Sequence, residues 1–151
     1  MVDQCLRLDA FIPFRLSVTS NLVSETIASA YQALFGLSIP EWRLITVIAE
    51  EDGTTQQLIA RRTRMDKVSV SRASIALAER GLIERRPHAS DRRSQSVHLT
   101  KSGRELYAAV APKALELERR IFERFDSADV ASFSKMLLQV QEATLALRDN
   151  V

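Results

Sequence analysis

The sequence of 151 residues predicts a mainly α-helical fold with one small β-hairpin, which places it in the α+β class. Apolar residues recur at helical spacing near both ends of the chain, and two short helical segments lie close together in its middle. Two short segments with strand character follow these helices. Only four Gly and four Pro occur, which argues against a turn-rich all-β fold. The 46% of apolar residues is enough for a packed core.

The first third of the chain predicts two helices. A helical apolar stripe ends at Gly36, so we expect one long helix over residues 11–35. The stripe consists of Leu16, Val23, Ile27, Ala30 and Leu34. Ser38-Ile-Pro-Glu41 has the pattern of a capping box and opens a second helix over residues 40–50. The expected buried side of this helix carries Trp42, Ile45 and Ile48.

The middle of the chain predicts a helix-turn-helix. Thr54-Thr-Gln-Gln57 has the pattern of another capping box, and it opens a short helix through Arg62 with Leu58 and Ile59 inward. Asp66 is the expected cap of the next helix, residues 67–80, and Gly81 ends that helix. About four residues join the two helices, which is the spacing of a helix-turn-helix.

A β-hairpin and further helices follow. Residues 82–87 and 94–99 are short enough for strands, and the polar residues 88–93 lie between them. This pattern predicts a hairpin with a basic tip, called a wing, directly after the second short helix. Thr100 is expected to cap a final helical region, which Pro112 should kink and Ser127 should restart.

The predicted domains are an N-terminal dimerisation helix (1–36), a winged helix-turn-helix lobe (37–100) and C-terminal dimerisation helices (101–151). The terminal helices combine long apolar stripes with acidic residues. One alternative is that they only complete the core of a monomer. We favour a homodimer interface, because the central lobe alone does not need so much additional helix.

The net charge of +2 conceals a strong asymmetry. Residues 55–104 contain 12 Lys and Arg but four Asp and Glu, a charge of +8, and the rest of the chain carries −6. Such a basic segment indicates a polyanionic partner. The alternative is an ordinary solvated basic face.

The predicted second helix of the helix-turn-helix supplies the main candidates for contacts with double-stranded DNA. Its first turns offer Lys67, Ser69, Ser71 and Arg72. An arginine can pair bidentately with guanine, and the hydroxyls can bond phosphates or bases. Lys67, Ser71 and either Ser74 or Ile75 are expected on one face, opposite a buried face with Val70, Ala73 and Leu77.

Two further groups of residues are candidate DNA contacts. Thr55 and Gln56 begin the preceding helix, whose free N–H groups suit a phosphate. At the wing tip, Asp91 can orient one of the adjacent Arg92 and Arg93, and the other can extend into a narrow minor groove.

Residues 37–107 resemble the winged helix-turn-helix of the MarR family of bacterial transcription regulators. The wing carries the resemblance most specifically: Asp91, Arg93, Leu99 and Thr100 match the family pattern D-x-R, five residues, then L-T. Four further segments also match, namely Leu37–Leu44, Leu58–Arg62, Asp66–Arg72 and Glu79–Arg86. The resemblance implies a homodimer that binds a pseudo-palindromic operator, most simply as a repressor, with Arg93 as the wing arginine and Asp91 as its partner.

The sequence departs from the family pattern at one position of the recognition helix. The family usually has a large apolar residue after Ser-Arg-Ala, whereas this chain has Ser74 followed by Ile75. We interpret this as an apolar residue displaced by one position around the helix.

The family often binds small aromatic carboxylates, phenols or their conjugates, so the resemblance also implies a small effector. Candidate lining residues are Phe11, Phe14, Arg15, Trp42 and Val47, with plain core packing as the alternative. The single Cys5 offers a second hypothesis, a redox-sensing regulator, although it precedes the first long helix.

Other classes find no support in the sequence. We expect no enzyme, cofactor or metal site, because no Ser/His/Asp set, phosphate-binding loop or metal-ligand cluster is visible. The longest uncharged stretch, residues 26–40, has 15 residues and is too short to span a membrane. With one cysteine and no apolar leader segment, the expected location is the reducing cytoplasm.

Overall fold

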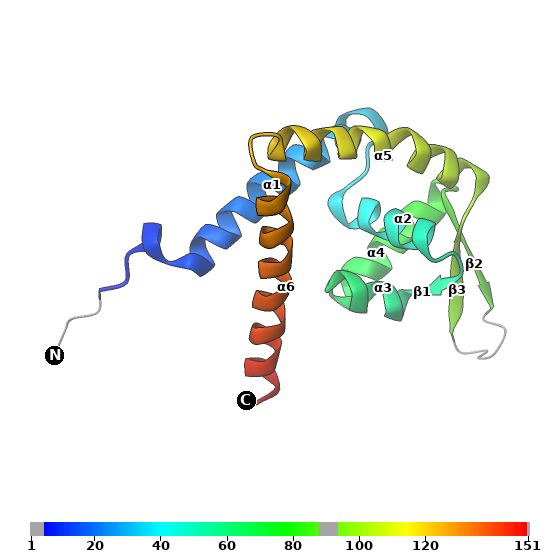
Figure 1. Ribbon diagram of the computed structural model, residues 1–151. Coiled ribbons are helices and arrows are strands. Elements are labelled where there is room, and N and C mark those ends of the chain that lie inside the picture. The colour runs from blue at the N-terminus through cyan, green and yellow to red at the C-terminus, as the bar shows by residue number, and fades with distance from the viewer. Residues whose placement is uncertain (1–4, 88–93, 151) are drawn as a thin grey trace. The chain divides into compact units, whose positions relative to one another are not determined.

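The computed structural model describes residues 5–87 and 94–150 and confirms a mainly helical fold with a small antiparallel sheet (Figure 1). The helices are η1 (Leu8–Ala10), α1 (Ile12–Phe35), α2 (Ile39–Glu50), α3 (Gln56–Thr63), α4 (Lys67–Glu79), α5 (Lys101–Phe122) and α6 (Ser127–Asp149). The strands are β1 (Thr54–Thr55), β2 (Ile83–Pro87) and β3 (Gln95–Leu99), in the sheet order β1-β3-β2.

The chain divides into two compact units, residues 1–115 and 116–151. The first contains α1 to α4, the sheet and most of α5. The second contains the end of α5 and α6. Within the second unit, the ring of Phe122 lies 6.2 Å from that of Phe125 and 6.3 Å from that of Phe133, measured between centroids.

The predicted helix boundaries are confirmed at most of the capping residues. Gly36 ends α1 with a φ of 62°, and Ser38 and Glu41 form the reciprocal capping box of α2. Asp66 accepts a hydrogen bond from the Ser69 N–H at 2.8 Å, and Thr100 accepts one from the Gly103 N–H at 3.0 Å. Pro112 lies inside α5 without interrupting it.

The start of α3 differs from the prediction by one residue. Thr55, and not Thr54, is the N-cap, because its side chain accepts a hydrogen bond from the Leu58 N–H. Thr54 instead belongs to β1 and pairs with Val97 of β3. A strand of two residues has no alternation that a sequence could reveal. The inward orientation expected for Leu58 was also wrong, since 37% of its surface is exposed.

The core of the first unit lies between the helix-turn-helix, the sheet and the start of α5. Its fully buried side chains include Leu44, Ile45 and Ile48 of α2, Ile59 of α3, Leu77 of α4, Val97 of β3 and Val110 of α5. Trp42 stacks between Tyr31 and Tyr107, with ring centroids 5.4 and 5.8 Å away. This aromatic stack joins α1, α2 and α5.

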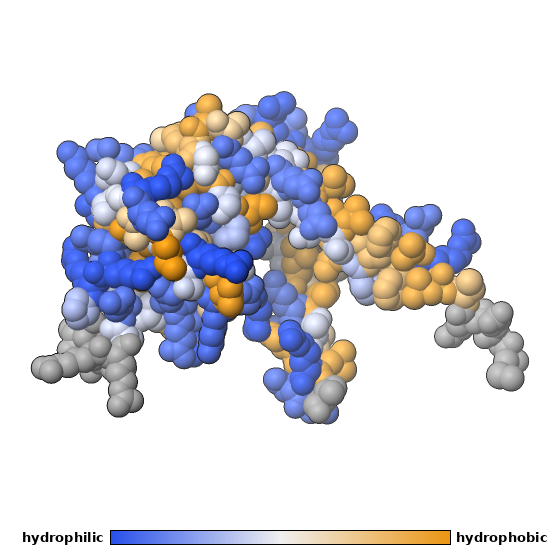
Figure 2. All heavy atoms as spheres, turned by 180° about the vertical axis from the view of Figure 1, so that it is seen from behind, coloured by the Kyte–Doolittle hydropathy of each residue, from blue (hydrophilic) through white to orange (hydrophobic). Residues whose placement is uncertain are grey.

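Two helical segments keep large apolar side chains exposed. One runs from η1 through the first half of α1, where Leu8, Phe11, Ile12, Phe14, Leu16, Val18 and Leu22 are exposed. Figure 2 shows apolar atoms along this arm, which ends at the grey N-terminal residues. The other is α6, which has no buried residue and exposes Phe133, Met136, Leu137, Leu138, Val140 and Leu147. Among the described residues, no helix has the length and apolarity that crossing a membrane requires.

Candidate nucleic-acid interface

Helix α4 has one buried face and one exposed face. Val70, Ala73, Ser74 and Leu77 are buried, whereas Val68 and Ile75 are 58% and 46% exposed. Arg72 is also exposed on this helix. Ser74 keeps the buried position, and the apolar Ile75, displaced by one position around the helix, is exposed. Ile75, and not Ser74, shares the outer face with Ser71 and Lys67.

The N-terminus of α4 is fixed by Asp66. One carboxylate oxygen accepts the Ser69 N–H, and the other accepts the Ser69 hydroxyl at 2.7 Å. These two hydrogen bonds hold the pKa of Asp66 below its usual value. Lys67, the first residue of α4, is exposed beside this cap. The Ser69 hydroxyl is thus used within the protein as a donor and can only accept from a ligand.

The first turn of α3 is held against α4 by side chains. Thr55 is half-buried and uses its oxygen to cap α3, which leaves its hydroxyl hydrogen for another acceptor. The amide nitrogen of Gln56 donates to the Ser74 hydroxyl at 3.1 Å. Arg85 of β2 donates to the same hydroxyl, also at 3.1 Å. The second amide hydrogen and the side-chain oxygen of Gln56 remain for contacts outside the protein.

The basic residues of the 55–104 segment fall into two groups. Ten of them are described, and all ten are exposed. Five bond to the chain itself: Arg62 to Glu50, Arg80 to the Phe35 and Gly36 carbonyls, Arg85 to Ser74, Arg86 to Glu84 and Arg104 to the Leu99 carbonyl. The side chains of the other five form no hydrogen bond or ion pair with another described residue: Arg61, Arg64, Lys67, Arg72 and Lys101.

Four of these unpaired cations lie in one continuous stretch of the helix-turn-helix. Arg61 lies in α3, Arg64 in the turn, and Lys67 and Arg72 in the first half of α4. Arg64 has a left-handed backbone with a φ of 58°. Sequence reasoning selected Lys67 and Arg72 but missed Arg61 and Arg64, whose freedom from internal partners becomes visible only in the folded chain.

The wing strands pair in the predicted hairpin. Arg85 lies opposite Val97, and Arg86 lies opposite Ser96. The predicted contacts at the wing tip, Asp91, Arg92 and Arg93, lie outside the described residues.

A Ser/His/Asp set does occur beside the wing, contrary to the expectation from the sequence. His98 Nδ1 lies 3.0 Å from an Asp52 oxygen, and His98 Nε2 lies 2.9 Å from the Ser96 hydroxyl. Burial tends to raise the pKa of Asp52, but hydrogen bonds from His98 and the Leu99 N–H outweigh it and lower that pKa. Ser96 is 9% exposed and also donates to the Arg86 carbonyl, so the set ties β3 to the turn before β1.

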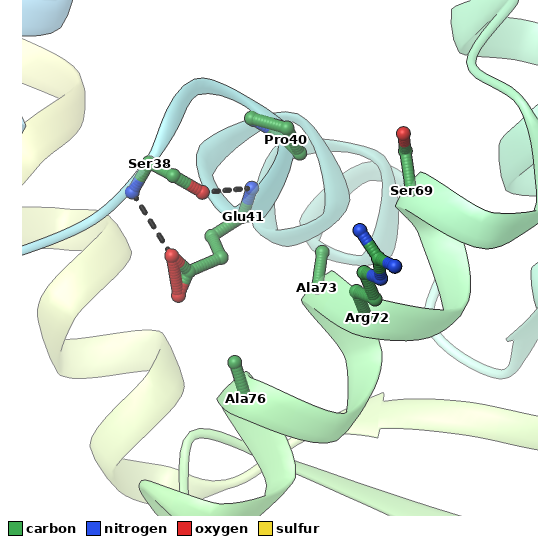
Figure 3. Close-up of a pocket in the computed structure, with 7 residues that line it drawn as sticks. All are labelled: Ser38, Pro40, Glu41, Ser69, Arg72, Ala73 and Ala76. Atoms are coloured by element: carbon green, nitrogen blue, oxygen red, sulfur yellow. Dashed lines mark hydrogen bonds between the residues drawn. The ribbon is translucent and has the colours of Figure 1, made fainter.

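A pocket of about 290 Å³ lies between the start of α2 and the side of α4 that carries Ser69, Arg72, Ala73 and Ala76 (Figure 3). Its lining residues are Ser38, Pro40, Glu41, Ser69, Arg72, Ala73 and Ala76. The small side chains of Ala73 and Ala76 leave this space open toward α2. Ser38 and Glu41 are satisfied by their own capping box.

The five residues expected around an effector separate in the structure. Trp42 and Val47 belong to the core or pack against it. Phe11 and Phe14 are 41% and 39% exposed near the start of α1, and Arg15 is exposed next to them. Cys5 is exposed and precedes η1 and α1, as the sequence predicted.

Known proteins are similar to this chain in sequence. The MarR family profile matches residues 35–94. An uncharacterized HTH-type transcriptional regulator from Mycobacterium leprae is 30% identical over 96 residues, a match that covers 62% of this chain and 67% of the relative.

A solved structure of a MarR family protein is also similar to this chain. A MarR/EmrR family transcriptional regulator from Acinetobacter sp. ADP1 has a TM-score of 0.84 and 27% identity, covering 92% of this chain and 98% of that one. Two more distant structures share the fold. CouR from Rhodococcus jostii RHA1, bound to p-coumaroyl-CoA, has a TM-score of 0.80, 24% identity and coverage of 90% and 95%. Sco3205 from Streptomyces coelicolor, in complex with DNA, has a TM-score of 0.82, 21% identity and coverage of 93% and 90%. The chain belongs to the MarR family of DNA-binding transcription regulators.

Proposed function

We propose that this chain is a repressor that binds a pseudo-palindromic operator as a homodimer and is released by a small effector. The observation that carries the DNA contact is the group of unpaired cations Arg61, Arg64, Lys67 and Arg72 on the helix-turn-helix. Cations without internal partners are free to replace the counterions of DNA phosphates, which is the main source of affinity.

The outer face of α4 supplies groups that can read bases. Arg72 can pair bidentately with a guanine edge, and Ser71 can donate to a base or a phosphate. The exposed side chains of Val68 and Ile75 suit contact with thymine methyl groups. Thr55 and Gln56 can donate to a phosphate at the start of α3. Ser69 can accept a hydrogen bond from a base N–H at the start of α4. We assign the minor-groove contact of the wing to Asp91, Arg92 and Arg93.

The exposed apolar residues support the homodimer. The segment from Leu8 to Leu22 exposes seven large apolar side chains and helix α6 exposes six, and a second copy can cover both sets. A pseudo-palindromic operator then matches the twofold symmetry of the protein, with half-sites about one helical turn apart. Light scattering after gel filtration should give about twice the chain mass of 17.0 kDa. A monomer at micromolar concentration would contradict this part of the proposal.

An aromatic or phenolic compound is the proposed effector class. The exposed Phe11 and Phe14 with the neighbouring Arg15 offer rings and a cation to an aromatic acid. The structure of CouR with p-coumaroyl-CoA supports this class, because that protein has the same fold. A thermal-shift screen of aromatic acids, phenols and their acyl-CoA conjugates tests it, since a bound ligand raises the apparent stability.

Gel shift on the DNA upstream of the chain's own gene tests the regulator itself. We expect a discrete complex whose affinity falls steeply as salt increases. Absence of any complex at low salt would contradict DNA binding. If oxidant rather than an aromatic compound released the DNA, and Cys5→Ser abolished that release, the redox hypothesis would replace the effector hypothesis.

A further inference from the structure

Ser74 is a buried hydroxyl near the middle of α4, with 0% of its surface exposed. Its oxygen lies 3.1 Å from the amide nitrogen of Gln56 and 3.1 Å from an Nη2 of Arg85. Gln56 is the first residue of α3, and Arg85 lies in β2 opposite Val97. One hydroxyl therefore connects three elements of the lobe.

The two donors use the full accepting capacity of this hydroxyl. A serine oxygen has two lone pairs, and here each lone pair faces an N–H donor from a different element. The bond from Arg85 is charge-assisted and thus stronger than a neutral bond. An apolar residue at this position would leave both donors without this acceptor, and Gln56 is already half-buried.

We propose that Ser74 is a positioning residue for DNA binding, acting through Gln56 and Arg85. It holds the start of α3 and the wing strand β2 in one fixed arrangement against α4. The inference rests on the proposed function, because it requires that α3, α4 and the wing contact the same duplex.

The effect is expected in affinity more than in folding. The apolar core around this position, with Ile59, Leu77 and Val97 all at 0% exposure, still joins the three elements when the hydroxyl is removed. Without the hydroxyl, α3, α4 and β2 would adopt several relative arrangements, and DNA binding would have to select the one that fits. Ordering that occurs only on binding lowers the affinity.

The central test compares Ser74→Ala with wild type on one operator duplex by fluorescence anisotropy, at fixed salt and well below the unfolding temperature. We expect the Kd to rise about tenfold, which corresponds to about 1.4 kcal/mol. Thr46→Val is the matched control, because within the described part of the chain the Thr46 hydroxyl bonds only to the Arg43 carbonyl of its own helix, at 2.8 Å. The Kd of this control should stay at the wild-type value. A Kd for Ser74→Ala within about twofold of wild type would overturn the inference.

A double-mutant cycle separates positioning from independent contacts. If Ser74 acts through Arg85, the variant with both Ser74→Ala and Arg85→Met should bind no more weakly than the weaker single variant. Losses that multiply would show that Arg85 acts independently and would overturn the inference. A purely structural role would lower the melting temperature of Ser74→Ala and leave its Kd unchanged, which also counts against positioning.

Two further outcomes keep this test separate from the proposed function. If circular dichroism shows that Ser74→Ala does not fold, Ser74→Cys replaces it, because a thiol is similar in size to the hydroxyl but is only a weak hydrogen-bond acceptor. An unchanged Kd for Ser74→Cys would overturn the inference. If wild type binds no duplex at low salt, the proposed function fails. If wild type binds and the variants bind equally well, only the role of Ser74 fails.

Discussion

The guanidinium of Arg80, at the end of α4, donates to the backbone carbonyl of Phe35 at 2.6 Å and to that of Gly36 at 3.4 Å. These carbonyls lie at the C-terminal end of α1, where a helix has unsatisfied acceptors and a partial negative charge. Helix α4 is thereby joined directly to the C-terminal end of α1.

Removing this link should lower the stability of the first unit. Arg80→Ala is expected to reduce the free energy of unfolding by about 1 kcal/mol, the usual net value of such a hydrogen bond. Arg61→Ala is the matched control, since the Arg61 side chain has no hydrogen-bond partner among the described residues. Urea denaturation measures both variants. Equal stabilities for the two would show that the contact with Phe35 contributes nothing.

Gly103 allows α5 to approach the turn after α4. A Cβ atom at this position would lie 2.0 Å from the backbone carbonyl oxygen of Leu82, which cannot move aside like a flexible side chain. Gly103→Ala should therefore destabilise the protein by about 3 kcal/mol, at the upper end of the range for overpacking.

The control for this change is Gly36→Ala. No atom lies within 4 Å of a Cβ there, but the φ of 62° is unfavourable for alanine. The expected cost is about 1 kcal/mol. The melting temperature of Gly103→Ala should lie below that of Gly36→Ala. A melting temperature for Gly103→Ala equal to or higher than that of Gly36→Ala would refute the steric explanation.

Features that depend on neighbours in sequence were predictable, and those that depend on the tertiary fold were not. Asp66 and Gly36 define helix ends through local geometry, so their roles followed from the sequence. The contact between Asp52 and His98 spans 46 residues, and no periodicity indicates it. For the same reason, the sequence located the basic segment but did not separate the cations paired within the chain from those that are unpaired.

Arg64 occupies the turn of the helix-turn-helix with a φ of 58° and a ψ of 19°. Glycine adopts this left-handed conformation without the cost that a side chain imposes. Glycine removes about 1–2 kcal/mol of this strain but costs about 0.5–1 kcal/mol in additional backbone entropy. Arg64→Gly should therefore raise the free energy of unfolding by about 0.5–1 kcal/mol. The same change should weaken DNA binding, because it removes an unpaired cation. A variant that is less stable than wild type in urea would contradict the first expectation.

Asp66 makes the stability of α4 depend on pH in the acid range. Hydrogen bonds from Ser69 lower the pKa of Asp66 in the folded chain relative to its usual value of 3.8. Its stabilising effect is thus complete above the unfolded pKa and is lost as the pH falls through the lower, folded pKa. In an Asp66→Asn variant, the side-chain amide can still cap the helix but cannot titrate.

Melting temperatures recorded from pH 6 down to about pH 2 test this expectation. The wild-type protein should lose more stability on acidification than Asp66→Asn does. Parallel curves for the two proteins would exclude Asp66 as a source of the acid sensitivity.

The proposed recognition of DNA depends above all on Arg72, on the exposed face of α4. The most direct measurement is the Kd of Arg72→Ala for an operator duplex, with Arg62→Ala as the control of equal charge change. Arg62 is paired with Glu50 at 2.5 Å, so its removal should leave the Kd nearly unchanged. Arg72→Ala should weaken binding by about 1–3 kcal/mol, the usual value of a bidentate contact to a base. Equal affinities for wild type, Arg72→Ala and Arg62→Ala would contradict the assignment of α4 as the recognition helix.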